Sequence, residues 1–496
     1  MMIMTQEQAI LKGQEQFEEM ASFVRRASKD GRPIDEVERN LWDSLLGLGR
    51  SLLEGYVAGH GTGDVGETLR YEGRTLRGLE SLHDRRYVSV FGELMISRCV
   101  YGARETQKHE VVPVDAWLGL PKGDFSYVLQ DWDQTFCVQN SYEPSRQTVE
   151  HVLGIGQSVR SLEQMTVSMA EAAEGFRESQ PKPLAKDEGS ILVLTADGKG
   201  VPMRRDSETE GPARRGRRKK GEKANKKRMA CVGAVYTIDP FVRRSQDVVN
   251  EVLRDRRQED RPVPQHKQLR AELTRMIDGE EVNSKDRIFS WFAEQVKIRN
   301  PRRGKPVVCV MDGERALWKK LKAYVSNVVC ILDLFHVLER LWQAAHCFHP
   351  EGSEAAQAFV TDRLERILEG QVGYVIGGLK QMATKHRLRG SKKDQLSKVI
   401  GYLERNRRFM HYDEYLAAGY PIGSGVAEGA CRHLVKDRME GTGMRWRTEG
   451  AQAMLDLRAV YLNDDWDTFQ THRIETERRK LYPYLQLVQR KRKKVA

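Results

Sequence analysis

Cysteine is scarce and scattered in this chain of 496 residues, because its seven cysteines include no C-x-x-C pair. Zinc ribbons need clustered thiols, and small secreted domains need a dense disulfide framework, so both classes are disfavoured. Three of the cysteines stand in or beside apolar runs. This placement is typical of small buried residues in a reducing compartment.

Long apolar segments are also missing. The sequence contains no run of about 18 apolar residues, and its start lacks the apolar stretch of a signal peptide. We therefore expect no membrane partner and a cytoplasmic location.

Acidic residues are outnumbered by basic ones, which gives a net charge of +12 and a pI near 9.2. Such an excess suits a polyanionic partner, because Lys and Arg displace counterions from phosphates. An ordinary soluble basic protein is the alternative. The length allows two to four domains with real cores.

The first third of the chain alternates between helical and extended patterns. Apolar residues at helical spacing predict helices over 5–57 and again over 125–178, where Ser145 is a plausible N-cap. Residues 86–101 alternate instead and are split by Gly92, which predicts a hairpin. Short helices around 140–146 allow two interpretations, a DNA-binding helix-turn-helix or an ordinary helical hairpin.

The middle of the chain carries an α/β pattern. Continuous apolar runs predict strands over 191–197, 229–239, 307–311 and 328–332. The first two are joined by a long basic insertion and should pair antiparallel. A helical region is expected after residue 239, with core positions at Phe289, Trp291, Phe292 and Val296. Residues 353–417 then show uninterrupted helical periodicity.

Three carboxylates mark the ends of distinctive segments. Asp197 closes the first strand, Asp312 closes the strand over 307–311, and Glu428 follows a Gly-Ser-Gly sequence on an expected helix. Hard oxygen ligands of this kind hold Mg²⁺, and a pair of such ions can drive phosphoryl displacement. Each carboxylate also has a purely structural interpretation: Asp197 and Asp312 could be turn residues, Asp312 could cap the following helix, and Glu428 could form a surface ion pair. Glu440 is the other candidate for the third carboxylate.

The sequence segments around these carboxylates resemble those of a known family. The segments are Leu194-Thr-Ala-Asp197-Gly-Lys-Gly200, Met311-Asp312-Gly-Glu-Arg and Tyr420-Pro-Ile-Gly-Ser-Gly-Val-Ala-Glu428-Gly-Ala-Cys, together with Asp333-Leu-Phe-His336. They resemble the bacterial insertion-sequence DDE transposases, whose ribonuclease-H-like core has a C/D-x-x-H signature of the Mutator-like type and a helical insertion. The resemblance spans about 190–470.

The resemblance implies a fold and a set of roles. The expected class is a multidomain α+β protein with a ribonuclease-H-like α/β core, interrupted by an all-helical insertion and preceded by a mostly helical DNA-binding region. Asp197, Asp312 and Glu428 would be the catalytic residues and would hold two Mg²⁺ ions, for which Mn²⁺ can substitute. Asp333 and His336 would support the active site, although His336 could equally be a core histidine.

Basic residues near the first carboxylate are the expected DNA contacts. A run beside Asp197 suits the DNA backbone, while Arg445 and Trp446 suit an unpaired base at a cleaved end; a solvated loop and a core Trp are the alternatives. The run comprises Arg204, Arg205, Arg214, Arg215, Arg217, Arg218, Lys219, Lys220, Lys226, Lys227 and Arg228.

The resulting division of the chain has six parts. They are an N-terminal helical region (1–67), a small β plus helical DNA-binding region (68–180), the first part of the core (190–350), the helical insertion (351–418), the last part of the core with the Glu helix (419–475) and a basic C-terminal tail (476–496).

The function implied is that of a DNA transposase. It would bind double-stranded DNA at terminal inverted repeats and at a target, act as a homodimer or larger assembly, and work near the nucleoid of a bacterial cell. Two alternatives stay open: a ribonuclease-H-like nuclease without strand transfer, and a domesticated DNA-binding protein.

Overall fold

The computed structural model describes residues 4–103, 110–183, 185–204, 227–254 and 260–495. The chain forms two compact units. One comprises Met1–Glu178 with Asp465–Ala496, and the other Ser179–Asp464. Within the described ranges, no helix is both long enough and apolar enough to cross a membrane.

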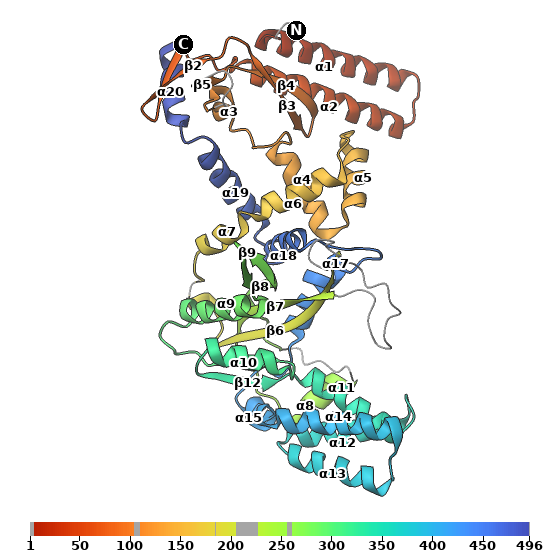
Figure 1. The fold of residues 1–496 in the computed structure, drawn as a ribbon. Helices are drawn as coiled ribbons and strands as arrows, with labels where there is room; N and C mark the ends of the chain where they lie inside the picture. Colours follow the sequence, from red (N-terminus) through yellow and green to blue (C-terminus); the bar gives the residue numbers. More distant parts are fainter. Residues whose placement is uncertain (1–3, 104–109, 184, 205–226, 255–259, 496) are drawn as a thin grey trace, which may run out of the picture. The chain divides into compact units, whose positions relative to one another are not determined.

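The second unit is built around a five-stranded mixed sheet (Figure 1). Its strands follow the order β12-β11-β6-β7-β8; β7 runs antiparallel to β6 and β8, while β11 runs parallel to β6 and β12. The predicted antiparallel pairing of the first two strands is thus confirmed, and the unit is mixed α/β. The strands are β6 (Ile191–Pro202), β7 (Lys227–Ile238), β8 (Gln265–Leu273), β11 (Val307–Met311) and β12 (Val328–Leu332).

Strand β8 was absent from the sequence prediction, which placed only helix after residue 239. The structure has α8 (Ser245–Arg254), then β8 and a short hairpin, and only then α9 (Ser284–Arg299). The first half of β8 is polar and largely exposed, so it lacks the apolar run that marks a strand covered on both faces. The hairpin consists of β9 (Arg275–Ile277) and β10 (Glu280–Val282). In α9, Phe289 and Phe292 are buried as predicted.

The two parallel strands lead into α10 (Arg315–Tyr324) and α11 (Leu334–Phe348), and the predicted helical block follows (Figure 1). Its buried apolar side chains belong to the same continuous core as the sheet. The block contains α12 (Glu354–Leu368), α13 (Val372–Lys385), α14 (Gly390–Asn406), the 3₁₀ turn η2 (Arg407–Phe409) and α15 (Tyr412–Ala417).

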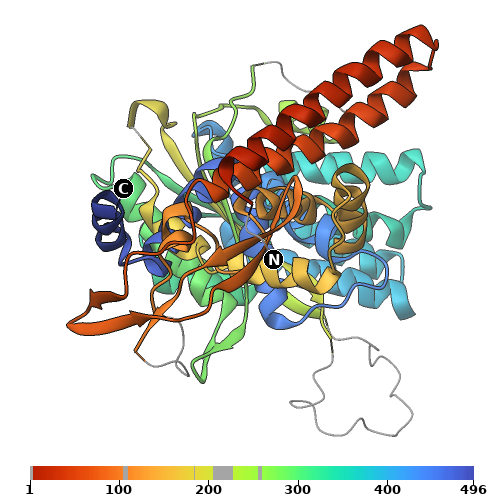
Figure 2. The ribbon, with the colours of Figure 1, turned by 90° about the horizontal axis from the view of Figure 1, so that it is seen from above.

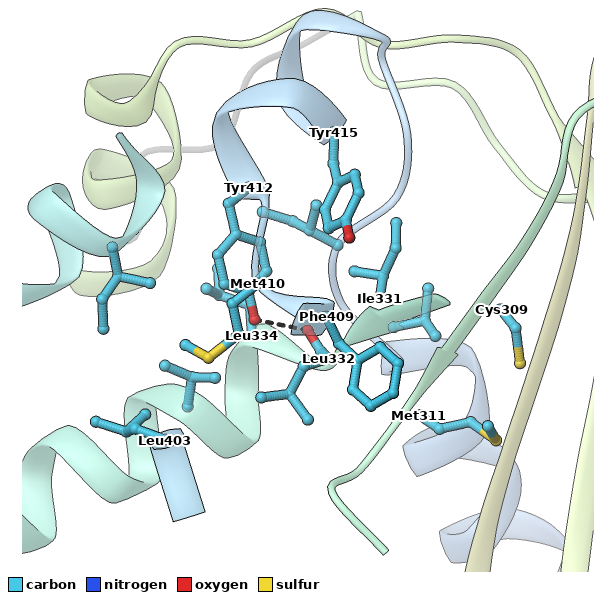
Figure 3. Packing of buried hydrophobic residues seen from close by; sticks show 14 of the residues in the cluster. Cys309, Met311, Ile331, Leu332, Leu334, Leu403, Phe409, Met410, Tyr412 and Tyr415 are labelled. Carbon is cyan, nitrogen blue, oxygen red and sulfur yellow. Dashed lines mark hydrogen bonds between the residues drawn. The ribbon is translucent and has the colours of Figure 1, made fainter. Parts of the chain in front are cut away.

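A buried hydrogen bond ties this block to the sheet. The hydroxyl of Tyr412 donates to the carbonyl of Leu332 across 2.7 Å, in an apolar setting that includes Phe409 and Met410 (Figure 3). Leu332 is the last residue of β12. The helical block is therefore fastened to the strand end that precedes Asp333.

The last part of the second unit is helical. It consists of α16 (Gly425–Ala430), a π-helical turn (Cys431–Lys436), α17 (Asp437–Met439) and α18 (Thr448–Leu462). Helix α18 packs against β8, where the Gln452 side chain accepts from the Leu273 N–H and donates to the Ala271 carbonyl.

The first unit begins with two antiparallel helices, α1 (Gln6–Lys29) and α2 (Ile34–Ala58), which lie side by side (Figure 2). Two small sheets follow. The predicted hairpin over 86–101 is confirmed as the β3–β4 pair, which turns between Ser89 and Gly92 with Gly92 at φ 111°. The strands are β1 (Thr68–Tyr71), β2 (Arg74–Gly78), β3 (His83–Ser89), β4 (Gly92–Arg98) and β5 (Tyr101–Gly102).

Short helices complete this unit. The chain returns to it at Asp465, a position inside the segment 419–475 that was predicted as the last part of the core. The N-cap prediction was wrong: Ser141 occupies the cap position, and Ser145 lies inside α5 with its hydroxyl donating to the Ser141 carbonyl. The helices are α3 (Pro113–Leu118), α4 (Tyr127–Gln139), α5 (Tyr142–Leu153), α6 (Val159–Ala170), α7 (Ala173–Ser179), α19 (Trp466–Leu481) and α20 (Leu485–Val495), with a 3₁₀ turn at Ala185–Asp187 linking toward β6.

Candidate active site

Three aspartates occupy the same position on three adjacent strands. Met311, the last residue of β11, pairs with Ala196 on one side and with Leu332 on the other. The residue that follows each of these three is Asp312, Asp197 or Asp333; Asp197 still lies within β6, whereas Asp312 and Asp333 come directly after β11 and β12. Neighbouring strands lie about 5 Å apart, so the register sets the three aspartates in a row at one edge of the sheet.

Asp197 lies within β6, so the prediction that it closes the strand was wrong: β6 continues to Pro202, because the residues after Asp197 go on pairing with β7. One carboxylate oxygen, Oδ1, accepts from the N–H of Gly198 across 2.6 Å. The other, Oδ2, accepts from the Cys431 thiol across 3.4 Å. The backbone of Asp197 is held by pairing with Val232 of β7, so its position is fixed by the sheet.

Asp312 stands in the short loop between β11 and α10. Its Oδ1 accepts from the N–H of Glu314 across 2.9 Å. Burial raises the pKa of Asp312, and the nearby charge of Asp197 raises it further. The loop is tightly packed, because a Cβ on Gly313 would meet the Tyr402 ring at 2.5 Å.

Asp333 is fully buried and accepts four hydrogen bonds. Oδ1 accepts from the N–H groups of Phe335 (3.2 Å) and Ser424 (3.0 Å), and Oδ2 from the Ser424 hydroxyl (2.7 Å) and Nδ1 of His336 (2.6 Å). Burial alone would raise the pKa of Asp333, but the hydrogen bonds from His336 and Ser424 outweigh it and lower the pKa. The Asp333 carboxylate therefore stays ionised in a buried position.

His336 is the charged partner of this carboxylate. Its hydrogen bond to Asp333 raises the pKa of the imidazole to about 9, although burial opposes the shift. The charges of Asp312 and Asp197 raise the pKa further. His336 therefore carries a positive charge at neutral pH and faces the carboxylates of the strand ends.

Glu428 joins the group from α16. Burial raises its pKa, and the charge of Asp333 adds to the shift. Among the described residues, one set offers three possible metal ligands whose atoms all lie within 4.8 Å of one another: Asp333, His336 and Glu428. This group could hold a metal ion. Asp197 and Asp312 are not members of it.

The chain leaves Glu428 through a π-helical turn, Cys431–Lys436. Such turns widen a helix and are frequent at functional sites. Here the turn places the thiol of Cys431 against Asp197. The guanidinium of Arg458 donates to the carbonyls of His433 and Leu434 in the same turn, which satisfies backbone groups there.

Glu440, the rival to Glu428, lies elsewhere. It forms an ion pair with Lys227 across 3.1 Å, and Lys227 pairs with Pro202 at the far end of β6. Glu428, in contrast, is close enough to Asp197 and Asp333 for their charges to shift its pKa. Of the two glutamates, Glu428 is therefore the one whose pKa responds to these aspartates.

The predicted DNA contacts are only partly described. Arg204, Lys227 and Arg228 flank the basic insertion; Arg228 donates to the Thr448 hydroxyl, and Arg204 pairs with Trp446 through the backbone. The remaining basic residues of that run lie outside the described residues: Arg205, Arg214, Arg215, Arg217, Arg218, Lys219, Lys220 and Lys226.

Trp446 and Arg445 differ in exposure. Trp446 is 8% exposed, its indole N–H donates to the Met439 carbonyl, and the Arg438 guanidinium lies over its ring. Arg445 is exposed and donates to the carbonyl of Met444. The tryptophan therefore packs as a core residue here, which was the alternative to base stacking.

Two residues of the site were missed from the sequence. Ser424 donates twice to Asp333, and Cys431 donates to Asp197. Both had a usable signal. Ser424 supplies the hydroxyl in the Gly-Ser-Gly sequence before Glu428. Cys431 follows Glu428 by three residues, and this spacing places the side chains of Glu428 and Cys431 on one helical face.

Comparison with known proteins adds little. No protein-family model and no curated protein matches the chain. Among solved structures, the chain aligns with the Drosophila P element transposase strand transfer complex, at 10% identity and a TM-score of 0.24, over 70% of this chain and 80% of that one. A similarity this low supports no conclusion about fold or function. The function therefore has to be inferred from the site itself.

Proposed function

We propose that this protein is a DDE-type DNA transposase of a bacterial insertion sequence, with Asp197, Asp312 and Glu428 as its catalytic carboxylates. The observation that carries the proposal is the register of β6, β11 and β12, which brings acidic residues from distant parts of the chain to one sheet edge beside Glu428. A sheet fixes such groups without help from a ligand.

The strand order supports a ribonuclease-H-like core. Numbered along the chain, the five strands lie in the order 3-2-1-4-5, and only the second is antiparallel to the rest. Asp197 stands on the first strand and Asp312 directly follows the fourth. The helices of 353–417 then stand between the fifth strand and the helix of Glu428, as the insertion does in the family that the sequence resembles.

The donor set fits a divalent metal. Asp312 and Glu428 both have raised pKa values, partly because other carboxylates lie close to them. A bound cation would relieve this repulsion. Two Mg²⁺ ions, or Mn²⁺ in their place, would activate the attacking hydroxyl and stabilise the leaving oxygen at such a site.

Two ligand sets compete, and they share Glu428. We assign the metals to Asp197, Asp312 and Glu428, because Asp333 is fully buried and each of its oxygens already accepts two hydrogen bonds, whereas Asp197 and Asp312 are only partly buried. Asp333 is better suited to a positioning role: it caps α11 and holds Ser424, the residue from which α16 begins. Asp333 thereby sets where Glu428 stands.

The DNA partners follow from the same proposal. Residues 1–180 would bind the terminal inverted repeats, and the basic insertion beside Asp197 would bind the backbone near the cleavage site. Both ends of the element must meet, so the active form would be a homodimer or a larger assembly on DNA. The site would sit in the bacterial cytoplasm, close to the nucleoid.

The test is Mg²⁺-dependent nicking of DNA that carries the ends of the element. Asp197→Asn, Asp312→Asn and Glu428→Gln should each lower the rate by about 100-fold or more, since changes to residues that only support a metal site already cost 10–100-fold. Binding to the ends, measured in EDTA, should persist. Glu440→Gln is the matched control and should cleave normally.

A wild-type rate in any one of the three variants would show that its residue is misassigned. Joining of pre-cleaved ends to a target separates a transposase from a nuclease without strand transfer. Absence of any nicking by the wild-type protein would favour a domesticated DNA-binding protein.

A further inference from the structure

A basic cavity of about 860 Å³ opens beside the carboxylates. Gly313, the neighbour of Asp312, forms part of its wall. The rest comes from α10, from the end of α14, from η2 and from His411, the N-cap of α15. The other lining residues are Arg315, Trp318, Lys319, Lys322, Glu404, Arg405, Asn406, Arg407, Arg408, Phe409 and His411.

The charge of this cavity is uncompensated. Its one carboxylate, Glu404, is paired with Lys380 outside the cavity across 2.6 Å. Six Arg and Lys side chains line the space, and none of the six forms an ion pair with any residue in the described part of the chain. A concave surface of one sign concentrates ligands of the opposite sign.

The cations stand in two groups on regular elements. Arg315, Lys319 and Lys322 are four and three residues apart on α10, a spacing that places them along one helix face. Arg405, Arg407 and Arg408 come from the end of α14 and from η2. The two groups border one cavity, so an elongated anion can contact both.

The floor between them is apolar and buried. The rings of Trp318 and Phe409 stack with centroids 4.3 Å apart at 19°, and both side chains are buried. The guanidinium of Arg408 lies 4.7 Å from the Phe409 ring centroid. The buried rings have no free face for a base, so recognition must come from the cations.

We propose that this cavity binds the phosphodiester backbone of a single nucleic acid strand as it passes the carboxylates. The proposal deepens the proposed function, on which it rests for the role of the strand. Cations on regular elements suit a repeated anion, and the lack of base contacts makes the binding independent of sequence. A free nucleotide offers the same phosphate chemistry, and the experiment below distinguishes it.

The experiment compares two triple variants of the full-length protein. The cavity variant is R405Q/R407Q/R408Q. The control variant is K297Q/R302Q/R303Q, which removes three exposed cations near the amino end of β11, away from Asp312. Both lose the same charge, so any difference between them comes from location.

Binding of a mixed-sequence single-stranded oligonucleotide is measured in EDTA between 50 and 200 mM salt. Each phosphate contact on a single strand contributes about 0.7 to the slope of log K against log salt. The cavity variant should lose about 2 in this slope, so its deficit in affinity relative to wild type should be about 16-fold greater at 50 mM than at 200 mM salt, while the control variant keeps the wild-type slope. Equal unfolding temperatures establish that both variants are folded.

Equal slopes in the two variants would overturn the proposal. So would a nucleoside triphosphate that binds the wild type, measured by calorimetry without metal, and is lost in the cavity variant while the oligonucleotide slope stays unchanged. Asp312→Asn should bind with the wild-type slope. Failure of the catalytic proposal would therefore appear as absent nicking with the slope difference intact.

Discussion

The hydroxyl of Ser424 offers the sharpest test of how the site is built. Ser424→Ala removes one of four hydrogen bonds to Asp333 and leaves the backbone N–H of residue 424 in place. The lost bond is short, at 2.7 Å, and both residues are buried. A hydrogen bond to a charged group contributes about 1.5–3 kcal/mol, so we expect the unit to lose about 2 kcal/mol of stability.

A matched serine in the same unit provides the control. Ser284 is also buried, but its hydroxyl accepts a hydrogen bond from the neutral hydroxyl of Thr274 across 3.2 Å. A neutral bond contributes about 1 kcal/mol. The midpoint of urea unfolding should therefore fall about twice as far for Ser424→Ala as for Ser284→Ala.

The two variants should also differ in activity. Ser424 joins Asp333 to the start of the Glu428 helix, so its loss should raise the Mg²⁺ concentration needed for half-maximal nicking by about 10–100-fold, the range for groups that orient metal ligands. Ser424→Thr keeps the hydroxyl and should restore most of this loss. Ser284→Ala should leave the Mg²⁺ dependence unchanged. Equal destabilisation by the two alanine variants, with unchanged Mg²⁺ dependence in both, would refute the reasoning.

Two further predictions concern stability. Burial raises the pKa of Asp133 to about 7, about three units above its ordinary value, so its folded form holds a proton that the unfolded chain has lost. The stability due to this proton is complete below about pH 4, falls as the pH rises and is gone above about pH 7, a change on the order of 4 kcal/mol. Asp133→Asn, which cannot ionise, should therefore unfold at a higher temperature than wild type at pH 8 and at nearly the same temperature at about pH 3.5; equal differences at both pH values would contradict this. Tyr412→Phe should lower the free energy of unfolding by about 1–3 kcal/mol, because it leaves the buried Leu332 carbonyl without its hydroxyl donor; a wild-type urea midpoint would show that the carbonyl finds another donor.

Local patterns of apolar residues in the sequence predicted much of the fold. Continuous apolar runs predicted β6, β7, β11 and β12 because consecutive residues of these strands are buried or half-buried on both faces, and completely buried in β11. Helical periodicity marked the block over 353–417 for the same reason, since one face of each helix packs in the core. Strand β8 was missed because its first half is polar and its buried second half carries two charged residues, Arg270 and Glu272, so no apolar run marks it.

The sequence by itself determined which carboxylates stand at the ends of the apolar runs of β6 and β11, namely Asp197 and Asp312. Only the tertiary structure decided that these strand ends are neighbours, because register depends on pairing between segments that are far apart in the chain. The same holds for the ion pair that holds Glu440 at Lys227, near the end of β6, and for the serine that joins Asp333 to the Glu428 helix. A linear pattern records how deeply each residue is buried, whereas a site depends on which buried groups meet.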